Sequence, residues 1–387
     1  KLIDLKDDGS FRLDMTYFNY ATGLTMTNKK FSDLFKNDVR SNESELKQFH
    51  MDVASSIQAV CEEIMLRIAK NLSLDYKIPN LCLAGGVALN CVANGKILQN
   101  GCFDKIWVQP AAGDAGGALG AALLVWYNEL DNKRSINTED SMCGSYLGPS
   151  FSNNEIKDTL ESCGANYQFM DDEKLINFAS ESLSDGKIIG WFQGRMEFGP
   201  RALGNRSILA DPSSEIMQKE LNLKVKFRES FRPFAPSILE EDVNKWFNID
   251  AKSPYMQFVC SINEDKRVGM TTDQHNLFGI EKLNIKRSTI PAVTHVDYSA
   301  RLQTVSKETN PRYHSLITSF KKLTGFPILV NTSFNVRGEP IVNSPHDAFR
   351  CFMGTNIDIL IIENYVLIKN EQNKLMSINY KNEFSLD

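Results

Sequence analysis

Twice in the first third of this chain, a short apolar run leads into paired glycines and then into a helix-forming segment. The run LCLA is followed by Gly85-Gly86, and we expect a helix through residues 92–98. An expected strand at residues 105–108 leads into GDAGGALGAALL at residues 113–124. A repeated order of strand, glycine turn and helix is typical of α/β proteins, in which ligands bind at the carboxyl ends of strands. The sequence therefore predicts an α/β fold with ligand sites at these turns.

Phosphate is the ligand that such turns favour, because backbone N–H groups and the helix dipole both attract it. The residues expected to contact a nucleotide here are Gly85, Gly86, Asn90, Gly116 and Gly117. The alternative, equally weighted on spacing alone, is that these glycines only allow close packing of helix on strand. Asp114 opens the second helix, where it can hold a metal ion beside phosphate or act as an N-cap. The capping role is favoured when this residue is taken alone.

Arginines and glycines alternate in the segment GRMEFGPRALGNRSILAD, residues 194–211, which contains Arg195, Arg201 and Arg206. A guanidinium group binds carboxylate or phosphate through two parallel hydrogen bonds, and glycine lets the backbone come close to the ligand. Two later segments, KVKFRESFRPFAPS and PILVNTSFNVRGEP, have a similar composition. Together they indicate chemistry on a small phosphorylated or carboxylated compound.

Five basic residues are the candidates for binding that anion: Arg201, Lys226, Arg228, Arg232 and Arg301. The alternative is a solvated charged face. It is weak for Arg201 and Arg232, because the runs FGPRALG and SFRPFAPS around them favour burial. A buried guanidinium group needs an anionic or carbonyl partner.

Two polar residues, Asn331 and Ser333, follow the apolar run PILV. An amide and a hydroxyl at a strand end can orient an NH2 group and a phosphate oxygen, or they can cap a turn. The five histidines show no metal-ligand spacing, and we assign none of them to catalysis.

Charge and composition limit the function classes. The net charge of −5 over 387 residues argues against general binding of nucleic acid, which usually leaves a basic footprint. A confined anionic ligand fits better, because basic residues are in local excess between residues 195 and 232. Eight cysteines without a CxxC pair suit a reduced, cytoplasmic protein, and no apolar run is long enough to span a membrane.

The turn-rich run GSYLGPSFSNN, residues 144–154, is the best candidate for a linker. We expect a first domain at residues 1–145, a linker at 146–165 and a second domain at 166–387. Apolar periodicity predicts helices at residues 51–72 and 172–184. Strands are expected at residues 187–192, 237–239, 255–262 and 327–330, with a hairpin at 357–368 and an irregular excursion at 263–290.

These segments resemble the O-carbamoyltransferases of nodulation-factor, cephamycin, novobiocin and aminoglycoside biosynthesis. The resemblance extends from about residue 15 to 368, through the runs CLAGGVALNCVANGK, QPAAGDAGGALGAAL, GRMEFGPRALGNRSILADP, KFRESFRPFAPSIL and FPILVNTSFNVRGEPIV. It implies two catalytic modules. The first is similar to the ASKHA (actin/Hsp70/sugar-kinase-like) domain of tRNA threonylcarbamoyl transferases, with only the C-terminal part present. The second is similar to a YrdC-like α/β domain.

The resemblance also implies a reaction. In the family, the YrdC-like domain forms carbamoyl-adenylate from carbamoyl phosphate and ATP, with Mg²⁺, and the ASKHA-like domain passes the carbamoyl group to a hydroxyl of an acceptor. By motif, the catalytic positions fall on Lys226, Arg201, Arg301, Asn331 and Ser333, and the metal position on Asp114. The phosphate-binding glycines of the family fall on Gly85, Gly86, Gly116 and Gly117. The acceptor is an unidentified small molecule or glycan, and a homodimer is left open.

One departure concerns the metal. Family members hold iron or another divalent ion with two histidines of an HxxxH helix, and no HxxxH occurs here. We expect that an N-terminal part of a longer polypeptide is missing, or that a partner chain supplies it. With Asp114 as the only protein ligand, the metal is expected to be weakly held or absent.

Two alternative functions stay open. One is tRNA threonylcarbamoylation through a threonylcarbamoyl-adenylate, which the acidic balance disfavours. The other is a non-catalytic nucleotide-binding subunit, which release of pyrophosphate dependent on carbamoyl phosphate would exclude.

Overall fold

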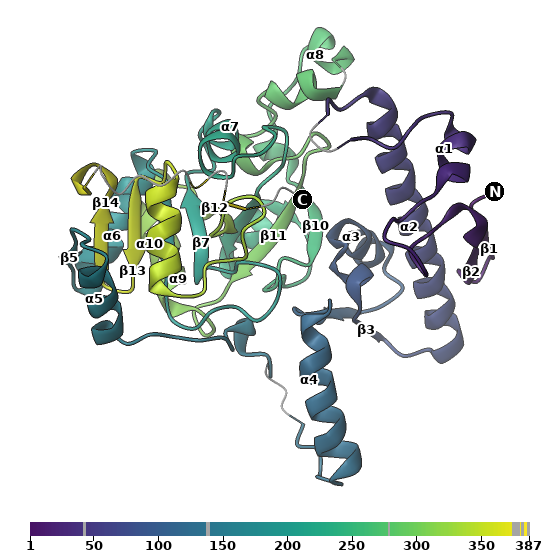
Figure 1. Cartoon of the computed structure of the whole chain (residues 1–387), viewed down its shortest axis with the longest axis horizontal. Helices are drawn as coiled ribbons and strands as arrows, with labels where there is room; N and C mark the ends of the chain where they lie inside the picture. Colours follow the sequence, from purple (N-terminus) through teal and green to yellow (C-terminus); the bar gives the residue numbers. More distant parts are fainter. Residues whose placement is uncertain (42–43, 137–139, 278, 374–379, 381–382, 385–387) are drawn as a thin grey trace. The chain divides into compact units, whose positions relative to one another are not determined.

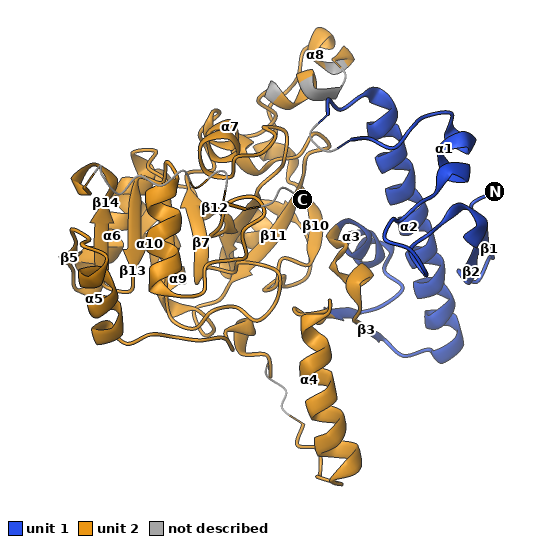
Figure 2. Cartoon of the chain, viewed as in Figure 1, with its two compact units in different colours: residues 1–82, 92–107 blue, residues 83–91, 108–387 orange. Residues whose placement is uncertain are grey.

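The computed structural model describes residues 1–41, 44–136, 140–277, 279–373, 380 and 383–384. The chain divides into two compact units (Figure 2). Unit 1 comprises residues 1–82 and 92–107, and unit 2 comprises residues 83–91 and 108–387. The expected domain and linker boundaries at residues 145 and 166 stay predictions.

Unit 1 is built around one long helix, α2 (Gln48–Tyr76). The predicted helix at residues 51–72 is confirmed and is longer at both ends. Its Ala69 packs with Ile97 and Phe103 in a small core. The other elements are the antiparallel strands β1 (Ile3–Leu5) and β2 (Phe11–Leu13), the short α1 (Lys29–Phe35), and α3 (Cys91–Asn100). The strands β3 (Asn80–Leu83) and β4 (Lys105–Val108) pair with each other, and both were predicted.

Unit 2 contains one large mixed sheet, ten-stranded within the described residues (Figure 1). Across the sheet the strands are β5 (Gln168–Phe169), β14 (Tyr365–Ile368), β13 (Ile359–Ile362), β6 (Ile189–Phe192), β7 (Arg206–Ala210), β12 (Ile328–Ser333), β8 (Ala235–Leu239), β11 (Ser299–Val305), β10 (Phe258–Ile262) and β9 (Phe247–Asn248). Among the described strands of this sheet, β13–β6 and β11–β8 are parallel neighbours, and the other neighbours are antiparallel. The α/β class is therefore confirmed in its general form, with a mixed sheet.

The main core lies on one face of this sheet. Helices α6 (Asp172–Ser184) and α9 (Pro311–Thr324) cover that face, where Trp191, Leu329 and Phe320 are fully buried. Side chains alternate between the faces of a strand. Since Trp191 of β6 points to α6 and α9, the adjacent Gly190 belongs to the other face. Helix α10 (Pro345–Gly354) packs there against β6 and β13 and contacts α5 (Asn153–Ser162).

The remaining helices of unit 2 are short or lie outside the core. They are α4 (Ala115–Leu124), with a π-helical turn at Val125–Glu129, α7 (Met217–Glu220), with a π-helical turn at Leu221–Val225, and α8 (Thr272–Asn276). In the predicted excursion at residues 263–290, the residues that the structure describes form short helices and an isolated β-bridge. In the part of the chain that the structure describes, no helix is long and apolar enough to cross a bilayer.

Candidate functional site

A polar loop follows strand β12, and the side chain of Lys226 holds it in place. Lys226 ends the π-helical turn after α7 and is 3% exposed. Its Nζ donates to Asn335 Oδ1 at 2.8 Å, to the Asn335 carbonyl at 2.9 Å and to Ser333 Oγ at 3.2 Å, and it also contacts the Ser333 carbonyl. Burial, with a smaller effect of Arg228, lowers the pKa of Lys226 to about 7. The surrounding oxygens oppose that change, because they favour the ammonium form.

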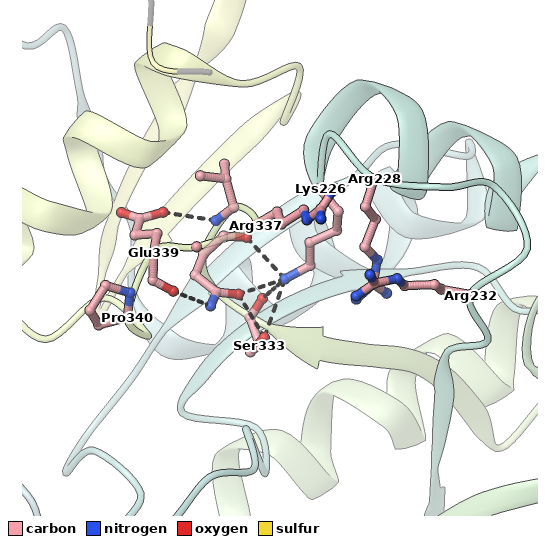
Figure 3. Close-up of a pocket in the computed structure, with 10 residues that line it drawn as sticks. Lys226, Arg228, Arg232, Ser333, Arg337, Glu339 and Pro340 are labelled. Atoms are coloured by element: carbon pink, nitrogen blue, oxygen red, sulfur yellow. Dashed lines mark hydrogen bonds between the residues drawn. The ribbon is translucent and has the colours of Figure 1, made fainter. Parts of the chain in front are cut away.

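This loop forms one wall of a pocket of about 240 Å³ (Figure 3). Four basic residues line it: Lys226, Arg228, Arg232 and Arg337. Glu339 is the acidic residue in the lining. Its carboxylate accepts a hydrogen bond from the Val336 N–H at 2.8 Å and another from the Tyr380 hydroxyl. So many cations around a small volume suit a ligand with several negative charges.

The side chains of Arg228 and Arg232 are each positioned by a polar side chain. Arg228 donates from Nε to Asn222 Oδ1 at 2.7 Å, and its guanidinium lies 5.1 Å from the centre of the Phe234 ring. Arg232 pairs with Glu229 at 3.0 Å. Burial, followed by repulsion from Arg232, lowers the pKa of Arg228 to about 10, so it remains charged at neutral pH. The two heads lie next to each other in Figure 3 and repel, and a polyanion between them would relieve that repulsion.

A second loop, residues 197–206, carries Arg201. The buried carboxylate of Glu197 organises it, accepting from the N–H groups of Leu203 at 2.6 Å, Asn205 at 2.9 Å and Arg206 at 3.3 Å. Gly204 takes φ +107°, a conformation that a side chain rarely permits. The loop is therefore rigidly built, and it presents Arg201 from a fixed backbone.

The positive charges of Arg201 and Arg301 repel each other. Burial, followed by repulsion from Arg301, lowers the pKa of Arg201 to about 10. The Nη2 of Arg201 reaches the Leu89 carbonyl at 3.5 Å, while its buried Nε has no hydrogen-bond partner among the described residues. Arg301 also acts electrostatically on Arg228. Three of the cations expected in this site therefore repel one another in sequence: Arg201 and Arg301 interact, and so do Arg301 and Arg228.

Asn331 is the buried centre of a polar network. Its Nδ2 donates to Gln303 Oε1 at 2.8 Å, to Ser237 Oγ at 3.0 Å and to the Ala202 carbonyl at 3.2 Å. These contacts use all its donors and fix the orientation of the amide. The remaining atom, Oδ1, is buried without a hydrogen-bond partner in the described part of the chain. An acceptor in that state is costly unless a ligand supplies a donor.

The sheet explains why these residues meet. Leu329, Asn331 and Ser333 alternate along β12 and share one face, as do Val305, Gln303 and Arg301 along β11. Leu329 and Val305 belong to the main core. Further along this face, β12 carries the Asn331 amide and then the Ser333 hydroxyl. Toward its start, β11 carries the Gln303 amide and then the Arg301 guanidinium. The site therefore lies where β12 ends and where β8 and β11 begin, and not only at carboxyl ends as in a parallel sheet.

The glycine turns line a separate pocket of about 530 Å³. Gly85, Gly86, Gly116, Gly117 and Asp114 contribute to it. A Cβ atom at Gly116 would lie 2.2 Å from the Ala111 carbonyl, so packing explains that glycine. At Gly85, Gly86 and Gly117 a Cβ would meet no described atom within 4 Å. Gly85 is explained by its φ of +100°, whereas close packing does not account for Gly86 or Gly117.

Asn90 and Asp114 are placed differently from each other. Asn90 ends the short 3-10 helix Gly86–Leu89, its N–H bonds to the Val87 carbonyl, and it is not among the residues that line the pocket. Asp114 occupies the N-cap position of α4, yet its side chain makes no capping hydrogen bond. No group of three or more His, Cys, Asp or Glu side chains that could hold a metal ion occurs in the described ranges. Asp114 alone does not make a site for a divalent ion.

Two of the three arginines in the segment at residues 194–211 serve the fold. Arg206 is fully buried, donates to the carbonyls of Gln193 and Asn205, and stacks 3.4 Å from the centre of the Phe192 ring. Arg195 donates to the carbonyls of Leu147 and Gly148. Sequence reasoning could not separate them from Arg201, because all three have similar neighbours.

Sequence reasoning also missed part of the lining. Asn335, Arg337 and Glu339 belong to the NVRGEP end of the run that follows β12, and they line the pocket. The alternating polar residues of this run are the signal that points to the three positions. Gln303 was missed because its strand, β11, was not predicted.

A cation-lined pocket on a mixed α/β sheet is suited in charge and size to a small phosphorylated or carboxylated anion. Two family models match the chain: the carbamoyltransferase N-terminus over residues 1–123 and the carbamoyltransferase C-terminus over residues 180–369. The chain belongs to the carbamoyltransferase family, as the resemblance predicted.

Individual proteins that are similar in sequence support the same family assignment. The chain is 57% identical, over its whole length, to the uncharacterized protein sll1178 of Synechocystis. It is 43% identical to nodulation protein NolNO of Sinorhizobium fredii over 86% of the chain, and 40% identical to nodulation protein NolO of Bradyrhizobium diazoefficiens over 95% of it. The chain spans 63%, 46% and 61% of these three proteins, respectively.

Proposed function

We propose that this protein is an ATP-dependent O-carbamoyltransferase that first forms carbamoyl-adenylate in the cation-lined site of unit 2. The observation that carries the proposal is a pair of buried groups without partners among the described residues, Arg201 Nε and Asn331 Oδ1. They belong to adjoining segments, since Asn331 bonds to the Ala202 carbonyl. One is a donor and the other an acceptor. A carbamoyl group offers an oxygen to the first and an N–H to the second.

Each side chain has a role in this scheme. Water hydrolyses carbamoyl phosphate to carbamate and inorganic phosphate, and a carbamate oxygen then attacks the α-phosphorus of ATP as pyrophosphate leaves. Arg201 and Arg301 bind the carboxylate-like end, while Asn331 selects the NH2 group. Lys226 and Ser333 are placed beside the phosphate oxygens, and Arg228 and Arg232 balance the charge of the leaving pyrophosphate. Mg²⁺ would accompany ATP.

The finer division of the chain is part of the proposal. We assign a YrdC-like domain to residues 166–387 and the C-terminal part of an ASKHA-like domain to residues 1–145. The open space at Gly86 and Gly117 supports a ligand that approaches the backbone at the turns of that first domain. The metal that the resemblance implies does not fit the described residues around Asp114, and no step is assigned to it.

The acceptor is proposed to be a hydroxyl of a small molecule or glycan, in keeping with the nodulation proteins among the relatives. We place the reaction in the cytoplasm, without nucleic acid or membrane as partner. A homodimer is compatible with this function, which does not require one.

The experiment is release of pyrophosphate from ATP, followed with carbamoyl phosphate and, separately, with acetyl phosphate. Acetyl phosphate carries a methyl group in place of NH2, so it leaves Asn331 Oδ1 without a donor. We expect a preference for carbamoyl phosphate of about 10⁴-fold, as found where a site is built around a hydrogen bond. Equal rates with both compounds would contradict the assignment of Asn331.

Variants locate the site. Arg201→Gln, Arg301→Ala and Lys226→Ala are expected to abolish release of pyrophosphate. Arg195→Gln is the matched control for Arg201→Gln, because among the described residues the Arg195 guanidinium bonds only to the backbone carbonyls of Leu147 and Gly148. Its rate should stay close to that of the unchanged protein. Normal rates in Arg201→Gln and Arg301→Ala would remove the proposed site.

A further inference from the structure

The acidic residue of the cation-lined pocket is turned away from the cations. Glu339 lies on the same loop as Arg337 and Asn335, and all three line the pocket. In Figure 3 its carboxylate points away from the Lys226 ammonium and toward the Val336 N–H. A carboxylate this close to several cations would be expected to pair with them. Something must therefore hold it in its observed position.

Hydrogen bonds do so, and besides the Val336 N–H and the Tyr380 hydroxyl, the Cys351 side chain is a further partner of this carboxylate. The Val336 N–H donates to Glu339 Oε2 at 2.8 Å, and the Tyr380 hydroxyl donates to Glu339 Oε1. Each carboxylate oxygen thus has its own donor. Tyr380 belongs to neither the loop nor the sheet, lies beyond the last strand, and is 1% exposed.

Tyr380 has a docking place of its own on helix α10. A Cβ at Gly354, the last residue of α10, would lie 2.3 Å from the Tyr380 side chain, so the tyrosine occupies the space that this glycine leaves. The Phe384 ring meets the Tyr380 ring edge-on at 5.3 Å. Arg350 of α10 lies over the same ring and pairs with Glu383 at 2.7 Å. These contacts fix the hydroxyl at Glu339.

We propose that the Tyr380 hydroxyl holds the Glu339 carboxylate away from Lys226 and Arg337, and so keeps the pocket open to phosphate oxygens. The inference rests on the proposed function to the extent that the pocket binds phosphoryl anions. Tyr380 is a positioning residue in this scheme, because it acts through Glu339 and does not touch the ligand. Without its hydroxyl, the carboxylate is free to turn toward the cations and compete with the anion.

The test is the affinity for inorganic pyrophosphate, measured by calorimetry at one fixed salt concentration. Tyr380→Phe removes only the hydroxyl, and we expect it to weaken binding about tenfold. Gly354→Ala should act in the same direction, because its new methyl group displaces the Tyr380 ring. Tyr365→Phe is the matched control: Tyr365 is also buried, but its hydroxyl donates to the Asn153 carbonyl. It should leave the affinity unchanged.

A second substitution distinguishes charge competition from a general loss of structure. Glu339→Gln in the Tyr380→Phe background keeps the shape but removes the charge, and it should restore most of the lost affinity. Unchanged binding in Tyr380→Phe, or weakened binding that Glu339→Gln does not restore, overturns the inference. If the unchanged protein fails to bind pyrophosphate, the proposed phosphate site fails with it. The two failures are therefore distinguishable.

Discussion

The ring of Tyr313 lies directly against the backbone of Gly204. A Cβ placed on Gly204 would come within 2.3 Å of the ring, and the residue takes φ +107°. Tyr313 is fully buried in the main core on α9. Through this contact the core sets the position of the loop at residues 197–206, and so of Arg201. The candidate site is thus built on the rigid part of unit 2.

Gly204→Ala is expected to destabilise the protein by about 2–5 kcal/mol, from backbone strain plus overpacking against Tyr313. Gly186→Ala separates the two causes. Gly186 also has a positive φ, +77°, but a Cβ there would meet no described atom within 4 Å. It should cost about 1 kcal/mol. Denaturant unfolding of both variants measures the difference, and equal losses would show that the ring contact contributes nothing.

The pKa of Lys226, lowered to about 7, predicts that pH acts on binding and on stability in opposite directions. Binding of sulfate, whose charge is constant from pH 6 to 9, should weaken as pH rises through about 7, because the ammonium becomes an amine. Folding stability should rise between about pH 7 and 10.5, because there the unfolded chain binds the extra proton. Calorimetric titration with sulfate at several pH values, beside denaturant unfolding, checks both signs.

Lys226→Met is the control for that titration. It removes the titrating group, so the affinity for sulfate should be lower and nearly independent of pH around neutrality. A pH dependence identical to that of the unchanged protein would assign the effect to another group.

Glu197→Gln should disturb the loop that carries Arg201. The Glu197 carboxylate accepts three backbone N–H bonds, and bonds to a charged acceptor are stronger than those to a neutral one. We expect a loss of about 1–3 kcal/mol in stability and a lower rate of pyrophosphate release. Glu155→Gln is the control, since Glu155 accepts a comparable N–H bond in an exposed capping box. It should change stability by at most about 0.5 kcal/mol and leave the rate intact.

The sequence was sufficient to predict helices and strands that show a clear apolar periodicity or are bounded by recognisable turn residues. Helix α6 at residues 172–184, strand β4 at residues 105–108 and the hairpin around Glu363-Asn364 were all predicted and are confirmed. Strand β7 was missed because it begins with Arg206, a charged residue whose burial depends on the Gln193 carbonyl and the Phe192 ring of the neighbouring strand segment. Such long-range partners leave no local pattern.

The candidate site shows the same limit. Lys226, Arg228, Arg232 and Ser333 were named from their motifs, and they line one pocket. The arrangement of the whole site depends on which strands are neighbours. Arg301 of β11 and Asn331 of β12 are aligned with each other because both strands pair with β8. A mixed sheet cannot be inferred from an alternation of strands and glycine turns, which predicts only the α/β class.

The glycine turns allow a test of ligand approach against packing. Gly116→Ala should be destabilising, because its Cβ would lie 2.2 Å from the Ala111 carbonyl. Gly117→Ala should fold normally, or slightly better, because alanine favours a helix and no described atom lies within 4 Å of its Cβ. If a ligand approaches the backbone there, Gly117→Ala will nevertheless weaken nucleotide binding, measured by equilibrium dialysis with labelled ATP. Unchanged binding together with unchanged stability would mean that Gly117 neither packs nor contacts the nucleotide, and the phosphate role of this turn would be lost.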